Sequence, residues 1–173
     1  MRVDAPRVSP FARSWCWYLL ATSFAAADQL TKIAVSTLMP YGQNIPLVGF
    51  FNLVHVWNTG AAFSFLADAD GWQRYFFIVI TLGVSIVLVV MLRKPRPSAE
   101  ALGYSLVLGG ALGNGFDRVA RGYVVDYLDF YWKNWHWPAF NLADCGIVLG
   151  VFLLVLNNFR TTKEQPRTAQ GLP

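Results

Sequence analysis

Long uncharged stretches separated by polar segments divide the chain into four predicted membrane-spanning helices. A bilayer core about 30 Å thick is crossed by roughly 20 mostly apolar residues. A segment in hydrocarbon must satisfy its own backbone hydrogen bonds, which favours a helix. Residues 14–27, 75–92, 101–116 and 145–159 contain no charged side chain. Extended to plausible helix ends, the pattern predicts an all-α membrane protein with four transmembrane helices over about 14–35, 73–92, 101–119 and 140–159.

The basic residues predict the orientation of these helices. Nine of the 14 lysines and arginines precede the first span, fill the turn between the second and third, or follow the fourth: Arg2, Arg7, Arg13, Arg93, Lys94, Arg96, Arg160, Lys163 and Arg167. By the positive-inside rule both termini are cytoplasmic. The basic N-terminus with Ala25-Ala26-Ala27 also resembles a cleavable secretory signal, but the three further spans favour an uncleaved anchor.

Composition supports a membrane protein over a soluble one. Hydrophobic residues make up 55% and charged residues 14% of the chain, whereas soluble domains carry about 25% charged residues. The net charge of +4 therefore reflects membrane orientation and not nucleic-acid binding. The polar tail over 161–173 is expected to be cytoplasmic and disordered. Cys16 and Cys145 are expected at opposite ends of the helices, too far apart for a disulfide.

Two segments are left on the extracytoplasmic side. Within 41–66, β-branched and aromatic residues surround an Asn/Gly break, which predicts a small β platform that rests on the membrane interface. The second segment, 120–139, is expected to be a tryptophan-containing periplasmic loop.

Ionisable and amide side chains gather at the outer ends of three predicted helices and in the adjoining loop. Ionisable residues in spanning helices are costly and are functional candidates by default. They are Asp28, Lys32, Asn114, Asp117, Arg118, Asp126, Asp129, Asn141 and Asp144. The pairs 28/32 and 114/118 have the i,i+4 spacing of side chains on one helical face, although inter-helix hydrogen bonding or snorkelling also explains such pairs. Asn141 and Asp144 have the spacing of a helix N-cap and a first-turn acid.

Several chemistries are weighed for this cluster. Ser23, Ser36 and Ser64 have no recognisable motif around them, and the isolated His55 and His136 give no zinc signature, so no metal or cofactor is expected. Two carboxylates that share a proton remain, because one can activate water while the other polarises a carbonyl. Spacing alone does not select the two acids from the five candidates at the outer ends.

Four motifs in order resemble those of one family. They are Asp28-Gln29-Leu30-Thr31-Lys32, Asn58-Thr59-Gly60-Ala61-Ala62-Phe63-Ser64, Gly113-Asn114-Gly115-Phe116-Asp117-Arg118 with Gly122-Tyr123-Val124-Val125-Asp126-Tyr127, and Phe140-Asn141-Leu142-Ala143-Asp144. With four spans of the same orientation, the chain resembles the bacterial lipoprotein signal peptidases, also called signal peptidase II.

The resemblance implies an aspartic endopeptidase of the bacterial inner membrane, formed by a single domain over 1–160, with its active site facing the periplasm. The catalytic dyad implied is Asp126 and Asp144. Asn58, Asn114, Arg118 and Asn141 would position the substrate or the dyad, and Asp28 and Lys32 would support the site. Tyr127 stands where the family often has Phe, which puts nothing catalytic in doubt.

The resemblance also implies the partners. The substrate would be a diacylglyceryl-modified prolipoprotein, cut immediately N-terminal to the lipidated cysteine. Membrane lipids are expected neighbours, a globomycin-type cyclic peptide is an expected inhibitor, and no nucleic acid is expected. Two other functions are considered: a small proton-coupled transporter and a non-catalytic membrane scaffold. The clustering of acids at one depth disfavours the transporter, which would distribute them through the bilayer.

Overall fold

The computed structural model describes residues 10–60, 66 and 69–163, with side chains described from 14 to 159 within those ranges. The helices are α1 (Pro10–Leu38), α2 (Trp72–Leu92), α3 (Ser98–Ala120) and α4 (Leu142–Lys163). The strands are β1 (Asn44–Val48), β2 (Phe51–Asn58), β3 (Val124–Trp132) and β4 (Trp135–His136). Four helices with a small antiparallel sheet match the predicted class. Residues 161–163 of the expected disordered tail continue α4, and the rest of the tail lies outside the described residues.

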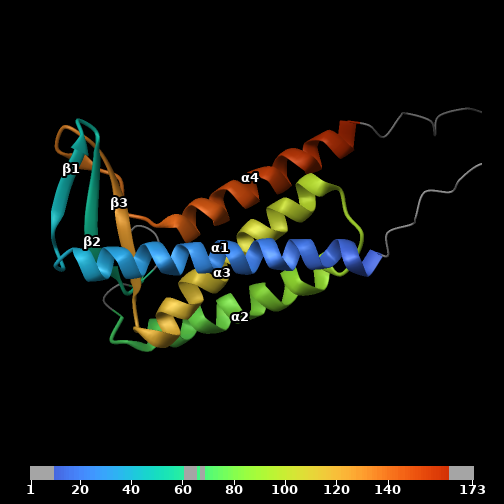
Figure 1. Cartoon of the computed structure of the whole chain (residues 1–173), viewed down its shortest axis with the longest axis horizontal. Helices are drawn as coiled ribbons and strands as arrows, with labels where there is room; N and C mark the ends of the chain where they lie inside the picture. Colours follow the sequence, from blue (N-terminus) through green and yellow to red (C-terminus); the bar gives the residue numbers. More distant parts are fainter. Residues whose placement is uncertain (1–9, 61–65, 67–68, 164–173) are drawn as a thin grey trace, which may run out of the picture.

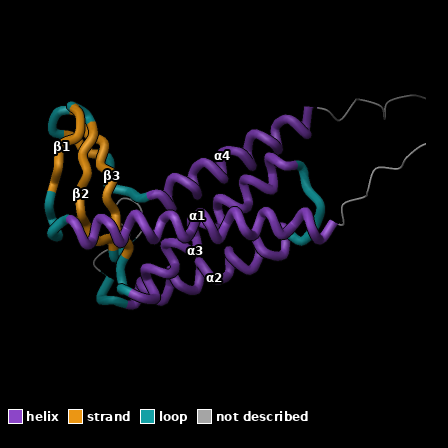
Figure 2. Tube along the Cα trace, viewed as in Figure 1, coloured by secondary structure: helices purple, strands orange, loops and turns teal. Residues whose placement is uncertain are grey.

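The sheet lies at one end of the helices, which we call the sheet end (Figures 1 and 2). The start of α1, the connection between α2 and α3, and the end of α4 lie at the opposite end (Figure 1). This arrangement places Arg93, Lys94 and Arg96 away from the sheet. Helix α3 is central and packs against each of the other three helices.

The helices turn apolar side chains outward and polar ones inward. In α1, Asp28 and Lys32 are completely buried, whereas Leu19 and Leu30 are each 67% exposed. Among the described residues, α2 and residues Leu142–Phe159 of α4 are long and apolar enough to cross a membrane. Helices α1 and α3 carry charged residues toward the sheet end, and their spanning the membrane stays a prediction.

The sheet is larger than predicted, because the expected loop 120–139 forms β3 and β4. The strands lie in the order β1-β2-β3-β4, and neighbours are antiparallel. The expectation of a loop was therefore wrong for most of this segment. Its β-branched and aromatic residues suit a strand, and pairing with β2 buries Val124 and Val125.

A bulge in β2 decides which side chains of β2 and β3 face each other. Leu53 pairs with Leu128 and Val56 with Asp126, so β2 contains one residue more than β3 between these pairs. Because strand side chains alternate, one extra residue moves those beyond it to the other face. Asn58 consequently lies on the same face as Asp126.

A left-handed turn joins α3 to β3. Gly122, just beyond the C-cap of α3, has φ 89°, a conformation that glycine adopts without strain. Its N–H donates to the carbonyl oxygen of Asp117 at 3.2 Å. The turn sends the chain directly from the polar end of α3 into the strand that carries Asp126.

Candidate active site at the sheet end

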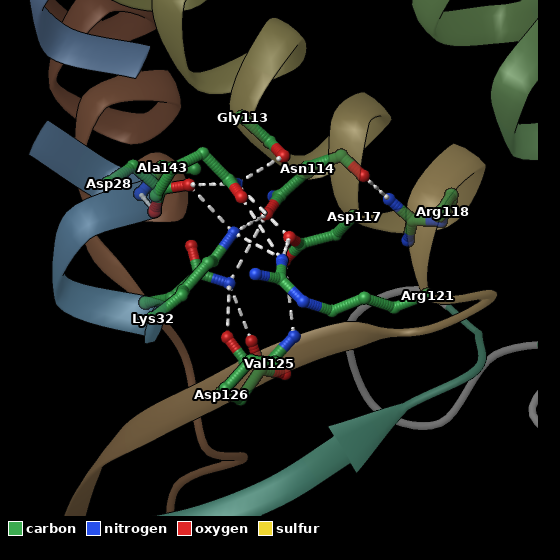
Figure 3. A network of polar contacts seen from close by, with 12 residues as sticks. Asp28, Lys32, Gly113, Asn114, Asp117, Arg118, Arg121, Val125, Asp126 and Ala143 are labelled. Carbon is green, nitrogen blue, oxygen red and sulfur yellow. Dashed lines mark hydrogen bonds and ion pairs between the residues drawn. The ribbon is translucent and has the colours of Figure 1, made fainter. Parts of the chain in front are cut away.

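A buried ion network connects α1 to α3 (Figure 3). Lys32 Nζ lies 2.8 Å from Asp28 Oδ2 and 2.9 Å from Asp117 Oδ2, and all three side chains have zero exposure. The same nitrogen donates to Asn114 Oδ1 at 2.8 Å. The predicted pairing of Asp28 with Lys32 is thus confirmed, and one lysine orients the amide of Asn114.

Asp117 extends the network to the beginning of β3. Its carboxylate pairs with Arg121 and accepts a hydrogen bond from Gln29 Nε2 at 3.0 Å. Its Oδ2 also accepts from the backbone N–H of Val125 at 3.3 Å, next to Asp126. Neither Gln29 nor Arg121 was predicted to take part in the site, although the i,i+4 spacing of Arg121 from Asp117 was a signal for this pair.

The N-terminus of α4 is held by its own cap and by α1. Asn141 Oδ1 accepts from the backbone N–H of Asp144 at 3.0 Å, and Asp144 Oδ2 accepts from the N–H of Asn141 at 3.2 Å, so the predicted cap is confirmed as a reciprocal capping box. Asp28 Oδ1 accepts from the N–H of Ala143 at 2.9 Å. These contacts fix the helix end that carries Asp144 against α1.

The hydroxyl of Tyr127 adds a link from β3. It accepts from the backbone N–H of Leu142 at 3.2 Å and lies 2.8 Å from Thr31 Oγ1 of α1. A phenylalanine at this position would leave this first N–H of α4 without that acceptor. Tyr127 therefore ties the strand of Asp126 to the helix of Asp144.

Asp126 is a buried carboxyl held by two amides. It is 2% exposed. Asn58 Nδ2 donates to its Oδ2 at 3.0 Å, and Asn141 Nδ2 donates to its Oδ1 at 2.6 Å. Burial raises the pKa of Asp126 to about 7, and the carboxylate of Asp144 acts in the same direction, while the amides of Asn58 and Asn141 oppose the rise.

Asp144 is half-buried and lies across the asparagines from Asp126. Its Oδ1 accepts from Asn114 Nδ2 at 2.8 Å. Asn141 Nδ2 also lies 3.3 Å from Asn114 Oδ1, so the two amides form a bridge between the carboxyls. Asp144 stands in the first turn of α4, where the helix dipole stabilises negative charge.

A cavity of about 770 Å³ is lined by Asp144 and by Asn58, which bonds Asp126. Its polar lining consists of Asn58, Asn114, Arg118 and Asp144, and its apolar wall is formed by side chains of α4 down to Phe152 and by the segment from Trp137 to Phe140. A site with a few convergent polar groups in an apolar cavity is typical of ligand binding.

Arg118 is a buried cation in the lining of this cavity. Its Nη2 donates to the carbonyl oxygen of Gly60 at 2.7 Å, and its guanidinium lies 4.8 Å from the centre of the Phe77 ring. Its Nε is buried and has no hydrogen-bond partner among the described residues. The side-chain pairing expected from the 114/118 spacing does not form, because Arg118 Nη1 reaches the backbone oxygen of Asn114, at 3.4 Å.

The structure therefore brings together all eight residues that the sequence singled out for the site: Asn58, Asn114, Arg118, Asn141, Asp28, Lys32, Asp126 and Asp144. Asp129 does not join them. It pairs with Asn52 at 2.8 Å and with His136 at 2.9 Å elsewhere in the sheet. Ser64 and the motif residues 61–63 lie outside the described residues.

Comparison with known proteins identifies the family. The family model described as signal peptidase (SPase) II matches residues 20–160. The chain belongs to the signal peptidase II family. A lipoprotein signal peptidase of Serratia marcescens is 54% identical over 90% of this chain and 89% of its own, and one of Aeromonas hydrophila is 50% identical over 89% and 93%.

Solved structures agree with this assignment to signal peptidase II. A bacterial membrane enzyme solved by the in meso method at 2.3 Å resolution superposes with a TM-score of 0.79 and 31% identity, over 88% of this chain and 93% of that one. A second, solved at 1.9 Å, gives a TM-score of 0.73 with 32% identity over 84% and 93%. The resemblance seen in the four motifs is confirmed, and signal peptidase II membership makes the chain an aspartic-type peptidase of a membrane enzyme family.

Proposed function

We propose that this chain removes the signal peptide from diacylglyceryl-modified prolipoproteins, cutting immediately N-terminal to the lipidated cysteine with Asp126 and Asp144 as its dyad. The observation that carries the proposal is the bridge of Asn114 and Asn141, which hydrogen-bonds both carboxyls beside one cavity. The relatives named lipoprotein signal peptidase support the substrate class.

All four helices span the bacterial inner membrane in this proposal, with both termini cytoplasmic and the sheet in the periplasm. The outward apolar and inward polar faces of α1 support its spanning, because a charge is tolerated in a bilayer when it faces the protein interior. The basic turn between α2 and α3, at the end away from the sheet, supports the orientation.

The different environments of Asp126 and Asp144 give each acid a different role in proton transfer. Asp126, with its pKa raised to about 7 by burial and by Asp144, holds the shared proton near neutral pH. Asp144, which lines the cavity at the positive end of α4, is the carboxylate that takes a proton from water.

Hydrolysis then proceeds without a covalent intermediate. Water attacks the carbonyl carbon while Asp144 takes its proton and Asp126 gives its own proton to the carbonyl oxygen, which forms a neutral diol. Asp144 passes its proton to the departing nitrogen, and the carbon–nitrogen bond breaks. Asp126 recovers a proton from the diol, which leaves a carboxylic acid on the signal peptide and an amine on the cysteine.

The other site residues hold substrate and acids in place. Arg118 Nε, buried without a partner among the described residues, is a donor available to a substrate carbonyl at the cavity. Lys32 fixes Asn114, which in turn fixes Asp144. The apolar wall of α4 suits the apolar parts of a lipidated substrate, and a globomycin-type inhibitor would occupy the same cavity.

The test is cleavage of a diacylglyceryl prolipoprotein by purified protein in detergent, followed as a gel shift. Asp126→Asn and Asp144→Asn should each lower the cleavage rate by at least about 100-fold, the scale of a lost general acid or base. Asp129→Asn is the matched control, because that acid is also buried in β3 but bonds Asn52 and His136. Asp117 is a poorer control than Asp129, because it belongs to the ion network of Lys32.

Near-normal cleavage by either dyad variant, in protein that elutes as a folded species, would refute the dyad. The two other functions predict different results for the same purified protein. A transporter would carry protons across liposomes and lose that flux in Asp144→Asn, and a scaffold would bind its partner equally well in both variants.

A further inference from the structure

A second groove lies on the side of α3 away from the acids. It has a volume of about 500 Å³ and runs between α1 and α2 with α3 as its floor. Its lining includes Ala26 and Gln29 of α1, Ile78 and Ser85 of α2, and Leu112 and Val119 of α3. It shares no lining residue with the cavity beside Asp144.

The groove is shorter than the hydrocarbon thickness of one bilayer leaflet. From Ile78 to Ser85 it follows eight residues of α2, a length of roughly 10 Å at the rise of an α-helix, whereas one leaflet contributes about 15 Å of hydrocarbon. Most of the side chains that line the groove are apolar, which suits part of an extended hydrocarbon chain.

Two arginines stand at the sheet end of this groove. Arg121 Nη1 donates to Gln29 Oε1 at 3.1 Å, and Arg74 Nη2 donates to the carbonyl oxygen of Val119 at 2.8 Å. Both acceptors belong to residues that line the groove. Each arginine thus contacts the groove lining at the level of the helix ends, where phospholipid headgroups lie if the helices span the membrane.

At the sheet end of the groove, Arg74 is a cation that no described carboxylate balances. Asp28 and Asp117 are balanced by Lys32 and Arg121 in the buried network. Arg74 is partly exposed, its guanidinium donates to the carbonyl oxygens of Arg118 and Val119, and no described carboxylate forms an ion pair with it. A planar guanidinium with remaining donors matches the oxygens of a phosphate.

We infer that this groove binds one anionic phospholipid from the leaflet at the sheet end, with an acyl chain between α1 and α2 and the phosphate at Arg74. This site is separate from the peptidase site, since α3 lies between the two. The inference rests on the proposed membrane placement but not on the proposed dyad.

The experiment uses the full chain in nanodiscs made from an equimolar mixture of phosphatidylglycerol and phosphatidylcholine, with the retained lipid counted by native mass spectrometry. The unmodified chain should retain phosphatidylglycerol roughly fivefold over phosphatidylcholine, the preference expected from one basic side chain at an anionic surface. Arg74→Gln should abolish the preference, and Arg74→Lys should restore most of it.

Filling the groove tests the acyl chain. Ala26 is an exposed residue of α1 that lines the groove, so Ala26→Trp should displace the lipid without disturbing the core. Ala34→Trp is the matched control, because Ala34 is an exposed alanine of the same helix outside the groove. Both alanine variants should still cleave prolipoprotein, since neither residue lines the cavity of the peptidase site.

Retention of the two lipids in equal amounts by the unmodified chain, or unchanged retention in Ala26→Trp, would overturn the inference. Displacement of the lipid by excess synthetic signal peptide would assign the groove to the substrate and would overturn it as well. If the unmodified chain retains phosphatidylglycerol preferentially but does not cleave prolipoprotein, the proposed function is refuted and the inferred lipid site stands.

Discussion

Two asparagines of β2 each hold one aspartate of β3, and they do so on opposite faces of the sheet. Asn52 lies directly opposite Asp129 and donates to it at 2.8 Å. Asn58 lies diagonally across from Asp126 and donates to it at 3.0 Å. Asp126 and Asp129 face opposite sides because they are three residues apart in β3. Asn52 and Asn58 are six residues apart and would share a face without the bulge between Leu53 and Val56. The inserted residue in β2 thus gives each aspartate its own asparagine.

The raised pKa of Asp126 sets the direction of the pH dependence. Its value of about 7 lies above the ordinary value of 3.8, so the folded protein binds more protons than the unfolded chain between these values. The contribution of Asp126 to stability is therefore present at low pH and is lost as the pH rises toward 7. If Asp126 must be protonated for cleavage, kcat/KM should fall as the pH rises through about 7.

Asn58→Ala should move this fall in kcat/KM to higher pH. The hydrogen bond from Asn58 lowers the pKa of Asp126, so its removal lets burial raise that pKa further. The loss of one hydrogen bond of roughly 1.5 kcal/mol should also reduce the maximal kcat/KM by about tenfold. Asn52→Ala is the control, and its pH profile should match that of the unmodified chain. A profile of Asn58→Ala displaced to lower pH would contradict the assignment of the proton to Asp126.

At the scale of elements, glycine lets α3 approach its neighbours closely enough for the ion network to form. A methyl group on Gly113 would lie 2.5 Å from Asp28 Oδ2, closer than side chains tolerate. The Asp28 carboxylate must sit there to reach both Lys32 and the N–H of Ala143. Small residues at helix interfaces are the usual means of such approach in membrane proteins.

Gly113→Ala should therefore destabilise the protein by about 1–3 kcal/mol, the usual cost of overpacking. Gly83→Ala is the matched control in α2, where an added methyl group meets nothing within 4 Å. That change should be neutral or stabilising by up to about 1 kcal/mol, because alanine is the better helix former. Thermal unfolding in detergent measures both, and equal melting temperatures for the two variants would contradict the argument.

The sequence predicted the parts of the site that depend on local spacing. The pairing of Asp28 with Lys32 and the cap of Asn141 on Asp144 follow from helical periodicity, which acts over three or four residues. The contact of Asn58 with Asp126 joins residues 68 apart and depends on the bulge in β2, which no local pattern announced. For the same reason, Asp126 and Asp144 were selected from five acids by family resemblance and not by spacing.

At the scale of the whole molecule, charged groups lie in the interior or at the two ends of the helix bundle, and apolar side chains cover its outside. The buried ions and amides lie at the sheet end, the basic turn with Arg93 and Lys94 lies at the other end, and large apolar side chains cover the outside of the helices between them. This distribution suits a bundle that crosses a bilayer with its acids near one surface. In the proposed membrane placement, the candidate site lies where a substrate anchored by acyl chains would present its peptide bond.

Cysteine labelling of intact cells tests that placement directly. In a background with Cys16 and Cys145 changed to serine, Asn134→Cys in the exposed turn between β3 and β4 should react with a membrane-impermeant maleimide added outside the inner membrane. Lys94→Cys, exposed at the other end, should react only after the membrane is opened, because the positive-inside rule places its turn in the cytoplasm. The reverse pattern would invert the topology, and it would leave the acids on the wrong side of the membrane for a periplasmic peptidase.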